Sequence, residues 1–177
     1  MDGSRRPTKE TTVIREAGYY DPGRLAHLMK TGFPGQALPP AHGGEDFQLV
    51  LSFALGFLPR ETIDNVLTAC CYAELSSKLP SRHFSKETLG GRYLIVILTD
   101  EMAQKPEKCV SSILGETAHY LLGHQEFEDW RGTESEGAME RREAARSMAI
   151  NWLLAYGKHF PGEQMALGEI VGELRHA

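Results

Sequence analysis

A run of six residues, Tyr-Leu-Ile-Val-Ile-Leu at positions 93–98, constrains the fold of this chain more than any other segment. A Gly-Gly pair lies shortly before the run, and a Thr-Asp pair follows it directly. The short length of the apolar run and the turn-forming residues around it favour a β-strand over a helix. The sequence therefore predicts a strand within residues 92–100.

Helical spacing of apolar residues is typical of most of the remaining chain. The predicted helices cover residues 22–30, 45–58, 60–77, 106–127, 138–156 and 162–176. Pro22 and Pro106 stand at first helical positions, where the missing N–H has no partner to lose. Two segments rich in Pro, Gly and polar residues, 34–44 and 78–91, are predicted to be loops.

A chain of 177 residues has the length of one domain, predicted here over residues 13–177 after a polar lead-in at residues 1–12. Hydrophobic residues make up 41% and charged residues 24% of the chain, a balance that excludes wholesale disorder. We expect an α+β, mostly helical fold. Its small sheet, around residues 92–98, is predicted to pack on the helix at 106–127.

The charge and hydropathy of the chain exclude two classes of partner. The chain has 24 acidic and 19 basic residues, a net charge of −5, and no basic block, so direct binding to nucleic acid is not expected. No apolar run approaches the ~18 residues of a membrane span, and residues 1–12 lack the apolar segment of a secretory signal. The expected location is therefore the cytoplasm.

The three cysteines do not form a disulfide framework, because their number is odd and Cys70 and Cys71 are adjacent. We expect reduced thiols, as in a cytosol-like compartment. Free cysteine is among the most frequently buried residue types. Cys70 and Cys71 are accordingly interpreted as small core residues of the helix at 60–77.

The segment Ile-Leu-Gly-Glu-Thr-Ala-His, residues 113–119, contains a pattern that can carry chemistry. Glu116 and His119 lie about 60° apart on a helix, so both point the same way. Zinc peptidases place two histidines at i and i+4 on one helix face, with a glutamate between them as general base. Here the glutamate and the second histidine are present, and Gly115 occupies the position of the first histidine.

A second group of candidates begins the helix at 138–156. Glu140 and Glu143 are i, i+3 neighbours on a face that starts acidic and becomes apolar. A glutamate that enters a seam between two helices can supply a third metal ligand. The same glutamates, next to several arginines, are also compatible with a solvated charged face.

These two segments resemble the ImmA/IrrE family of zinc metallopeptidases over about residues 92–155. In that family a short strand precedes an H-E-x-x-H helix that often ends in Leu-Leu-Gly-His, and a second helix begins with Glu-x-x-Glu-Ala. The resemblance implies a zincin-like domain in which Glu116 is the catalytic base. It also implies that His119 is a zinc ligand, that Glu143 is the third ligand, and that His124 matches the histidine that often follows the motif.

The glycine at position 115 departs from the family pattern and predicts a degraded zinc site. Catalytic zinc normally has three protein ligands plus water, so the remaining ligands are expected to bind zinc weakly or not at all. His124 lies about 140° from His119 on a continuous helix and is not expected to join the same site. A replacement ligand would have to come from elsewhere, such as His83 or a partner chain.

Active members of the family cleave helix-turn-helix repressors. The resemblance therefore implies a protein or peptide partner, such as a transcriptional repressor. The predicted function is a non-catalytic protein-binding or regulatory module derived from a peptidase, whose strand pairs with an extended peptide. The alternative is an active zinc peptidase that acts on a regulatory protein, with the missing ligand supplied elsewhere.

A helical di-iron protein is a further alternative, because such proteins use two E-x-x-H motifs and two additional glutamates. Glu173 and His176 form the second match, and Glu74 and Glu143 would be the extra carboxylates. The predicted strand at 92–98 does not belong in such a helical bundle, and Glu173 and His176 lie where a terminal helix frays.

Overall fold

A computed structural model of the chain describes residues 14–15, 18–36, 38–78, 84–102, 104–124 and 137–176. The fold is α+β and mostly helical, with a small sheet of three parallel strands. In chain order the elements are β1 (Ile14–Arg15), β2 (Tyr19–Tyr20), α1 (Pro22–Thr31), β3 (Ala41–His42), α2 (Glu45–Leu55), α3 (Arg60–Ala69), β4 (Cys70–Leu75), α4 (Lys86–Leu89), β5 (Tyr93–Leu98), α5 (Pro106–Leu121), α6 (Ala138–His159), the 3₁₀ turn η4 (Pro161–Glu163) and α7 (Gln164–His176).

The main sheet has the strand order β3-β4-β5, and all its strands are parallel. β4 is the central strand, and its first four residues are at most 2% exposed because both faces of the strand are covered. β5 pairs with β4 along its whole length, from Cys70 opposite Tyr93 to Leu75 opposite Leu98. Among the described residues β5 pairs with no other strand, so it forms an edge of the sheet.

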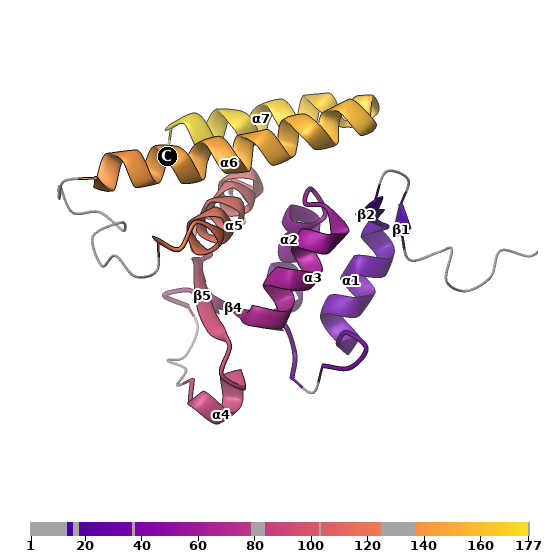
Figure 1. Cartoon of the computed structure of the whole chain (residues 1–177), viewed down its shortest axis with the longest axis vertical. Helices are drawn as coiled ribbons and strands as arrows, with labels where there is room; N and C mark the ends of the chain where they lie inside the picture. Colours follow the sequence, from indigo (N-terminus) through magenta and orange to yellow (C-terminus); the bar gives the residue numbers. More distant parts are fainter. Residues whose placement is uncertain are drawn as a thin grey trace, which may run out of the picture.

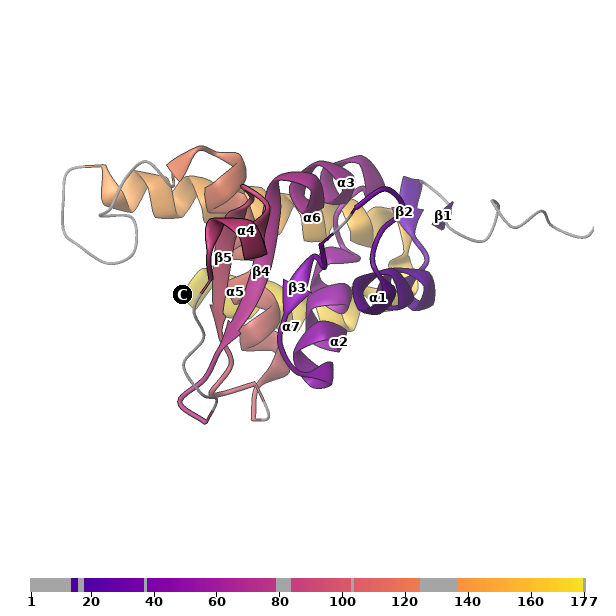
Figure 2. The same ribbon diagram turned by 90° about the horizontal axis from the view of Figure 1, so that it is seen from below.

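Helix α5 connects the sheet with the other helices. It packs against β5, α2, α6 and α7 (Figure 1). Helices α6 and α7 lie side by side across one end of the molecule, whereas α1, α2 and α3 lie on the side away from β5 (Figures 1 and 2). The prediction that the sheet packs on the helix beginning at Pro106 is confirmed by the contact between α5 and β5.

The prediction of one helix over residues 60–77 is wrong in its second half. Helix α3 ends at Ala69, and the chain becomes extended at Cys70, with φ −124° and ψ 157°. Apolar spacing at Cys70 and Leu75 fits a helix, but a strand buried on both faces also gives a near-continuous apolar run. Cys70 and Cys71 are therefore core residues of the central strand, not of a helix.

The other predicted helices are confirmed with shifted ends. α2 stops at Leu55, one turn earlier than expected, and α6 continues to His159, three residues beyond the predicted end. α5 ends at Leu121 instead of residue 127. The cause is Gly123, whose φ of 74° is the left-handed conformation that terminates helices.

Several short elements were not predicted. The pair β1–β2 forms a small antiparallel ladder, β3 lies within the expected loop at 34–44, and α4 lies within the expected loop at 78–91. The predicted lead-in at residues 1–12 is outside the described residues. Where the structure is described, no helix has both the length and the apolar character needed to cross a bilayer.

Candidate functional site

A groove of about 580 Å³ opens between β5, α5 and α6. The carboxyl ends of β4 and β5 form one wall, with Leu75 and Leu98 as exposed apolar side chains. Helix α5 contributes Gly115, Glu116 and His119 of the zinc-peptidase-like motif. Helix α6 contributes Arg142 and Arg146. This volume lies in the range of sites that bind small ligands or peptide side chains.

The groove exposes the backbone edge of β5. Residues 96–98 of this edge strand line the groove consecutively, although successive side chains of a strand point to opposite faces. The N–H of Thr99 donates to the C=O of Leu75, 2.9 Å away, so alternate residues of β5 direct their backbone toward β4. The backbone groups of Val96 and Leu98 therefore point to the open edge.

Gly115, Glu116 and His119 all line the groove from α5. Helical periodicity predicted that these three residues share a face, and the structure brings them together. A Cβ placed on Gly115 meets no atom within 4 Å, so the groove has open space at the position of the missing histidine.

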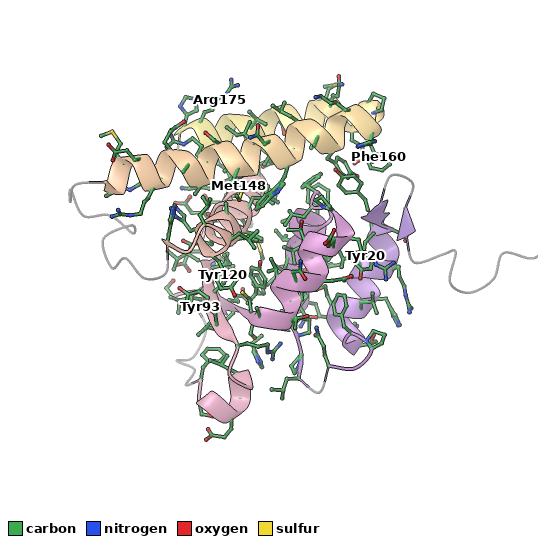
Figure 3. The ribbon with its side chains drawn as sticks, in the orientation of Figure 1. Tyr20, Tyr93, Tyr120, Met148, Phe160 and Arg175 are labelled. Atoms are coloured by element: carbon green, nitrogen blue, oxygen red, sulfur yellow. The ribbon has the colours of Figure 1, made fainter. Side chains whose placement is uncertain are left out.

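The opposite face of α5 is tied to the central strand by a buried hydrogen bond. Thr117 Oγ1 donates to the C=O of Ile113, 2.7 Å away, so the Tyr72 hydroxyl donates to Thr117 Oγ1, also at 2.7 Å. Burial raises the pKa of Tyr72, which keeps this hydroxyl protonated as a donor. Tyr93 and Tyr120 stack at 5.3 Å between ring centroids, so α5 also contacts the edge strand β5 (Figure 3).

His124 returns to α5 after the left-handed turn at Gly123. Its Nδ1 lies 2.8 Å from the Nδ1 of His119, and the ring centroids are 5.0 Å apart. The 140° separation expected between these histidines is wrong, because the helix ends before residue 124. His124 is only 7% exposed, and burial, together with the nearby charge of Arg141, lowers its pKa.

Glu143 is not among the residues that line the groove. Its side chain is 62% exposed, and its carboxylate accepts a hydrogen bond from Nη1 of Arg146 at 2.8 Å. The structure therefore does not place Glu143 with His119. The side chains that α6 directs to the groove are those of Arg142, Ala145 and Arg146.

The described residues do not fit the three-ligand zinc site that the family resemblance implies. Gly115 has no side chain, His119 is hydrogen-bonded to His124, and Glu143 pairs with Arg146. Over the part of the chain that the structure describes, no three His, Cys, Asp or Glu side chains form a group able to hold a metal ion. His83, a suggested replacement ligand, lies outside the described residues.

Glu74 and Glu173, two carboxylates of the di-iron alternative, form contacts with different parts of the chain. Glu74 accepts hydrogen bonds from the N–H of Gly44 and the hydroxyl of Thr99, both at 2.8 Å. Glu173 pairs with Lys105 at 3.6 Å. These contacts assign both glutamates to structural roles, which does not favour the di-iron alternative.

Sequence reasoning did not assign Arg142 and Arg146 to the site. Their i, i+4 spacing was the available signal, since it places both side chains on one face of α6.

Comparisons with protein-family models, curated proteins and solved structures give no match for this chain.

Proposed function

We propose that this chain is a protein-binding module, and that it binds an extended peptide segment of a regulatory protein alongside the edge strand β5. The edge of β5, which pairs with no strand other than β4 among the described residues and lines the groove, is the observation that carries the proposal. Unpaired backbone groups on an edge strand form a template for another strand, and many peptide-binding domains use this mode of recognition.

The side chains around the edge support the same function. Leu75 is 50% exposed and Leu98 is 67% exposed, and both line the groove. Exposed leucines that adjoin a concave site supply apolar contacts for alternate side chains of an extended peptide. The backbone of β5 would thus provide affinity, and the groove would select the side chains.

We further infer that the module descends from ImmA/IrrE-like peptidases and has kept the groove while losing the zinc site. Glu116 and His119 line the same groove as the β5 edge, which supports this descent. The open space at Gly115 and the pairing of Glu143 with Arg146 support loss of the metal. The partner in this proposal is a regulatory protein, such as a transcriptional repressor, that is bound and not cleaved.

A proline substitution at the edge tests the proposal. Val96→Pro removes one N–H from the open edge and leaves the ladder to β4 intact, since proline is tolerated where the N–H faces outward. Linear peptides of about twelve residues would be selected from a displayed library against the wild-type protein. We expect Val96→Pro to weaken their binding at least about tenfold and Val96→Ala to change it less than about threefold.

The location of binding supplies the second readout of this experiment. Amide resonances of β5 should shift when a selected peptide is added to the wild-type protein. Circular dichroism would establish that both variants fold. Binding that is insensitive to Val96→Pro, or shifts confined to other elements, would contradict the proposed function.

An active zinc peptidase is the second candidate, and the presence of Glu116 and His119 in one groove favours it. Elemental analysis of the purified protein separates the two functions. The binding module should contain no stoichiometric zinc and should leave its bound peptide intact. One zinc per chain that is lost in His119→Ala, with peptide cleavage that is lost in Glu116→Gln, would establish the peptidase instead.

A further inference from the structure

We infer that the protein has a second ligand site, a pocket between α2, α5 and α7 that binds a small organic cation with an apolar body. The pocket has a volume of about 310 Å³ and shares no lining residue with the peptide groove beside β5. The second site therefore goes beyond the proposed function and does not depend on it.

The walls of the pocket are mostly apolar. Helix α2 contributes two side chains that keep much of their apolar surface in water, Leu49 at 59% and Phe53 at 49% exposed. The other apolar lining residues come from all three helices and are Val50, Pro106, Val110, Ala166 and Ile170. A concave apolar site buries the hydrocarbon part of a ligand, and this volume lies at the lower end of the range for small-molecule sites. It suits a compact molecule better than a segment of polypeptide.

The aromatic wall of the pocket is held in place by the core. Phe53 packs against Phe57 in a T-shaped arrangement, with 5.0 Å between ring centroids, and Phe57 is only 3% exposed. An aromatic ring fixed in this way offers a surface to a flat ring of the ligand. It also attracts a cation that lies over its face.

Two carboxylates complete the pocket, Glu107 from α5 and Glu169 from α7. Within the described part of the chain, neither of them has a hydrogen-bond or ion-pair partner. The described lining contains these two glutamates and no lysine, arginine or histidine, which gives it a net charge of −2.

The charged residues next to the pocket do not cancel this charge. Lys105 pairs with Glu173 at 3.6 Å, and Lys108 pairs with Glu101, so each lysine is neutralised by a carboxylate that does not line the pocket. The two pairs together contribute no net charge. On α2 the charged residue nearest in sequence to the lining is Asp46, which adds to the negative sign. The pocket therefore attracts a cation after its neighbours are counted.

The apolar walls and the carboxylates together define the ligand. A hydrocarbon body fills the pocket, and an ammonium group at its end donates hydrogen bonds to the glutamates. An ammonium has three donors, so one group can serve both carboxylates. The chemical class is thus a small hydrophobic amine, such as an arylalkylamine. A carboxylate on the same body would be repelled.

Three small molecules that share a phenylbutyl body test the site. They are phenylbutylamine, phenylbutanol and phenylpentanoate, whose ends are cationic, neutral and anionic. We expect the amine to bind the wild-type protein at least about tenfold more tightly than the alcohol, and the carboxylate to bind more weakly than the alcohol. Amide resonances of α2 and α7 should shift on binding, whereas those of β5 should not. Added salt should reduce the preference for the amine, because Glu169 is exposed.

Neutral variants of the glutamates locate the charge that selects the amine. Glu107→Gln and Glu169→Gln keep the size of the side chain, and each should reduce the preference for the amine over the alcohol at least about threefold. The double variant should remove the preference. Glu61→Gln makes the same change at an exposed position of α3 that does not line the pocket, and it should keep the preference within about twofold of wild type.

A substitution that fills the pocket tests the location. Ala166→Phe adds a large side chain to the lining and should abolish binding of the amine and the alcohol alike. Ala155→Phe makes the same change at an exposed position of α6 outside the pocket and should bind both as the wild-type protein does. Circular dichroism would establish that every variant folds.

Equal binding of the amine and the alcohol would overturn the cationic specificity, as would a preference that survives in the double glutamine variant. Absence of shifts with all three molecules, or binding that Ala166→Phe leaves unchanged, would overturn the site. A wild-type dimer that Ala166→Phe dissociates would also overturn it, because a second copy of the chain would then occupy the pocket. The peptide groove is judged separately, by the response of peptide binding to Val96→Pro.

Discussion

His119 and His124 share a hydrogen bond between their Nδ1 atoms, which lie 2.8 Å apart at the carboxyl end of α5. One ring must donate at Nδ1 and the other must accept, so the accepting ring is not protonated at that atom. Protonation of both rings breaks the contact. The pair therefore joins the groove residue His119 to the buried residue His124 only while at least one imidazole is neutral.

The stability of the protein should decrease as the pH falls through the range in which unfolded histidine titrates. Burial, and then the charge of Arg141, lowers the pKa of His124 below its usual value of 6.5. The unfolded state therefore binds the proton more readily, and the free energy of unfolding decreases as the pH falls below about 6.5. Urea unfolding between about pH 5 and pH 7.5 measures this loss.

Substitution of His124 provides the check on this pH dependence. His124→Gln should flatten the decrease, whereas His27→Gln, at an exposed position of α1, should keep it. Equal slopes in the wild-type protein and His124→Gln would show that another group causes the pH dependence.

The hydrogen bond between Tyr72 and Thr117 should stabilise the packing of α5 against the sheet. Tyr72→Phe removes one buried hydrogen bond and should lower the free energy of unfolding by about 1 kcal/mol. Thr117→Val leaves the tyrosine hydroxyl buried without its acceptor and should cost about 1–3 kcal/mol. The double variant should lose about 1 kcal/mol less than the two single losses added together.

A second tyrosine serves as the control for this double-mutant cycle. Tyr93 is half-buried and contacts the same helix through its stacked ring. Because Tyr93→Phe keeps the ring, its effect should be within about 0.5 kcal/mol. Chemical denaturation measures all the variants, and strict additivity of Tyr72→Phe and Thr117→Val would contradict the proposed coupling.

The parts of the fold with long or sharply bounded patterns could be predicted from the sequence. The strand at 93–98 and the helix that begins at Pro106 follow from local periodicity and turn residues. The central strand β4 could not be recognised in the same way. Its residues are buried on both faces, so they lack the alternation that distinguishes a strand from a buried helix.

The candidate site was predictable only within one helix. Glu116 and His119 reach the same groove because a single α5 fixes their relative directions. The position of Glu143 depends on how α6 is rotated against α5, which periodicity does not determine, and the structure pairs this residue with Arg146. The contact of His124 with His119 depends on the left-handed turn at Gly123. This turn ends α5 at Leu121, whereas the helical spacing of the sequence predicted a helix to residue 127.

The three cysteines should react slowly with thiol reagents in the folded protein. Burial raises the pKa of Cys70 to about 12 and that of Cys109 to about 11, and it also raises the pKa of Cys71. The thiolate is the reactive form, so little reaction is expected at about pH 8. Colour release from an aromatic disulfide reagent should report three thiols in denaturant and fewer than one in native buffer. Fast labelling of a native cysteine would contradict its burial in the core.

Replacement of Gly115 by alanine should stabilise the protein. The position is in the interior of α5, and the added Cβ meets no atom within 4 Å. Glycine in a helix interior costs about 0.5–1 kcal/mol relative to alanine, so the free energy of unfolding should rise by that amount. A decrease on chemical denaturation would show that the groove does not have the open space described above.

Gly115→His tests whether the groove has kept the framework of a zinc site. The new imidazole would lie at i−4 from His119 on the groove face of α5, which is the spacing that zinc peptidase helices use. We expect the variant to bind zinc at least about tenfold more tightly than the wild-type protein, as measured by competition with a chelating dye. Gly115→Ala controls for the change in helix propensity, and a second substitution, His119→Ala, should remove the gain. If Gly115→His binds zinc no better than Gly115→Ala, the motif face of α5 does not have the geometry of a metal site, and the inferred descent from zinc peptidases loses its main chemical support.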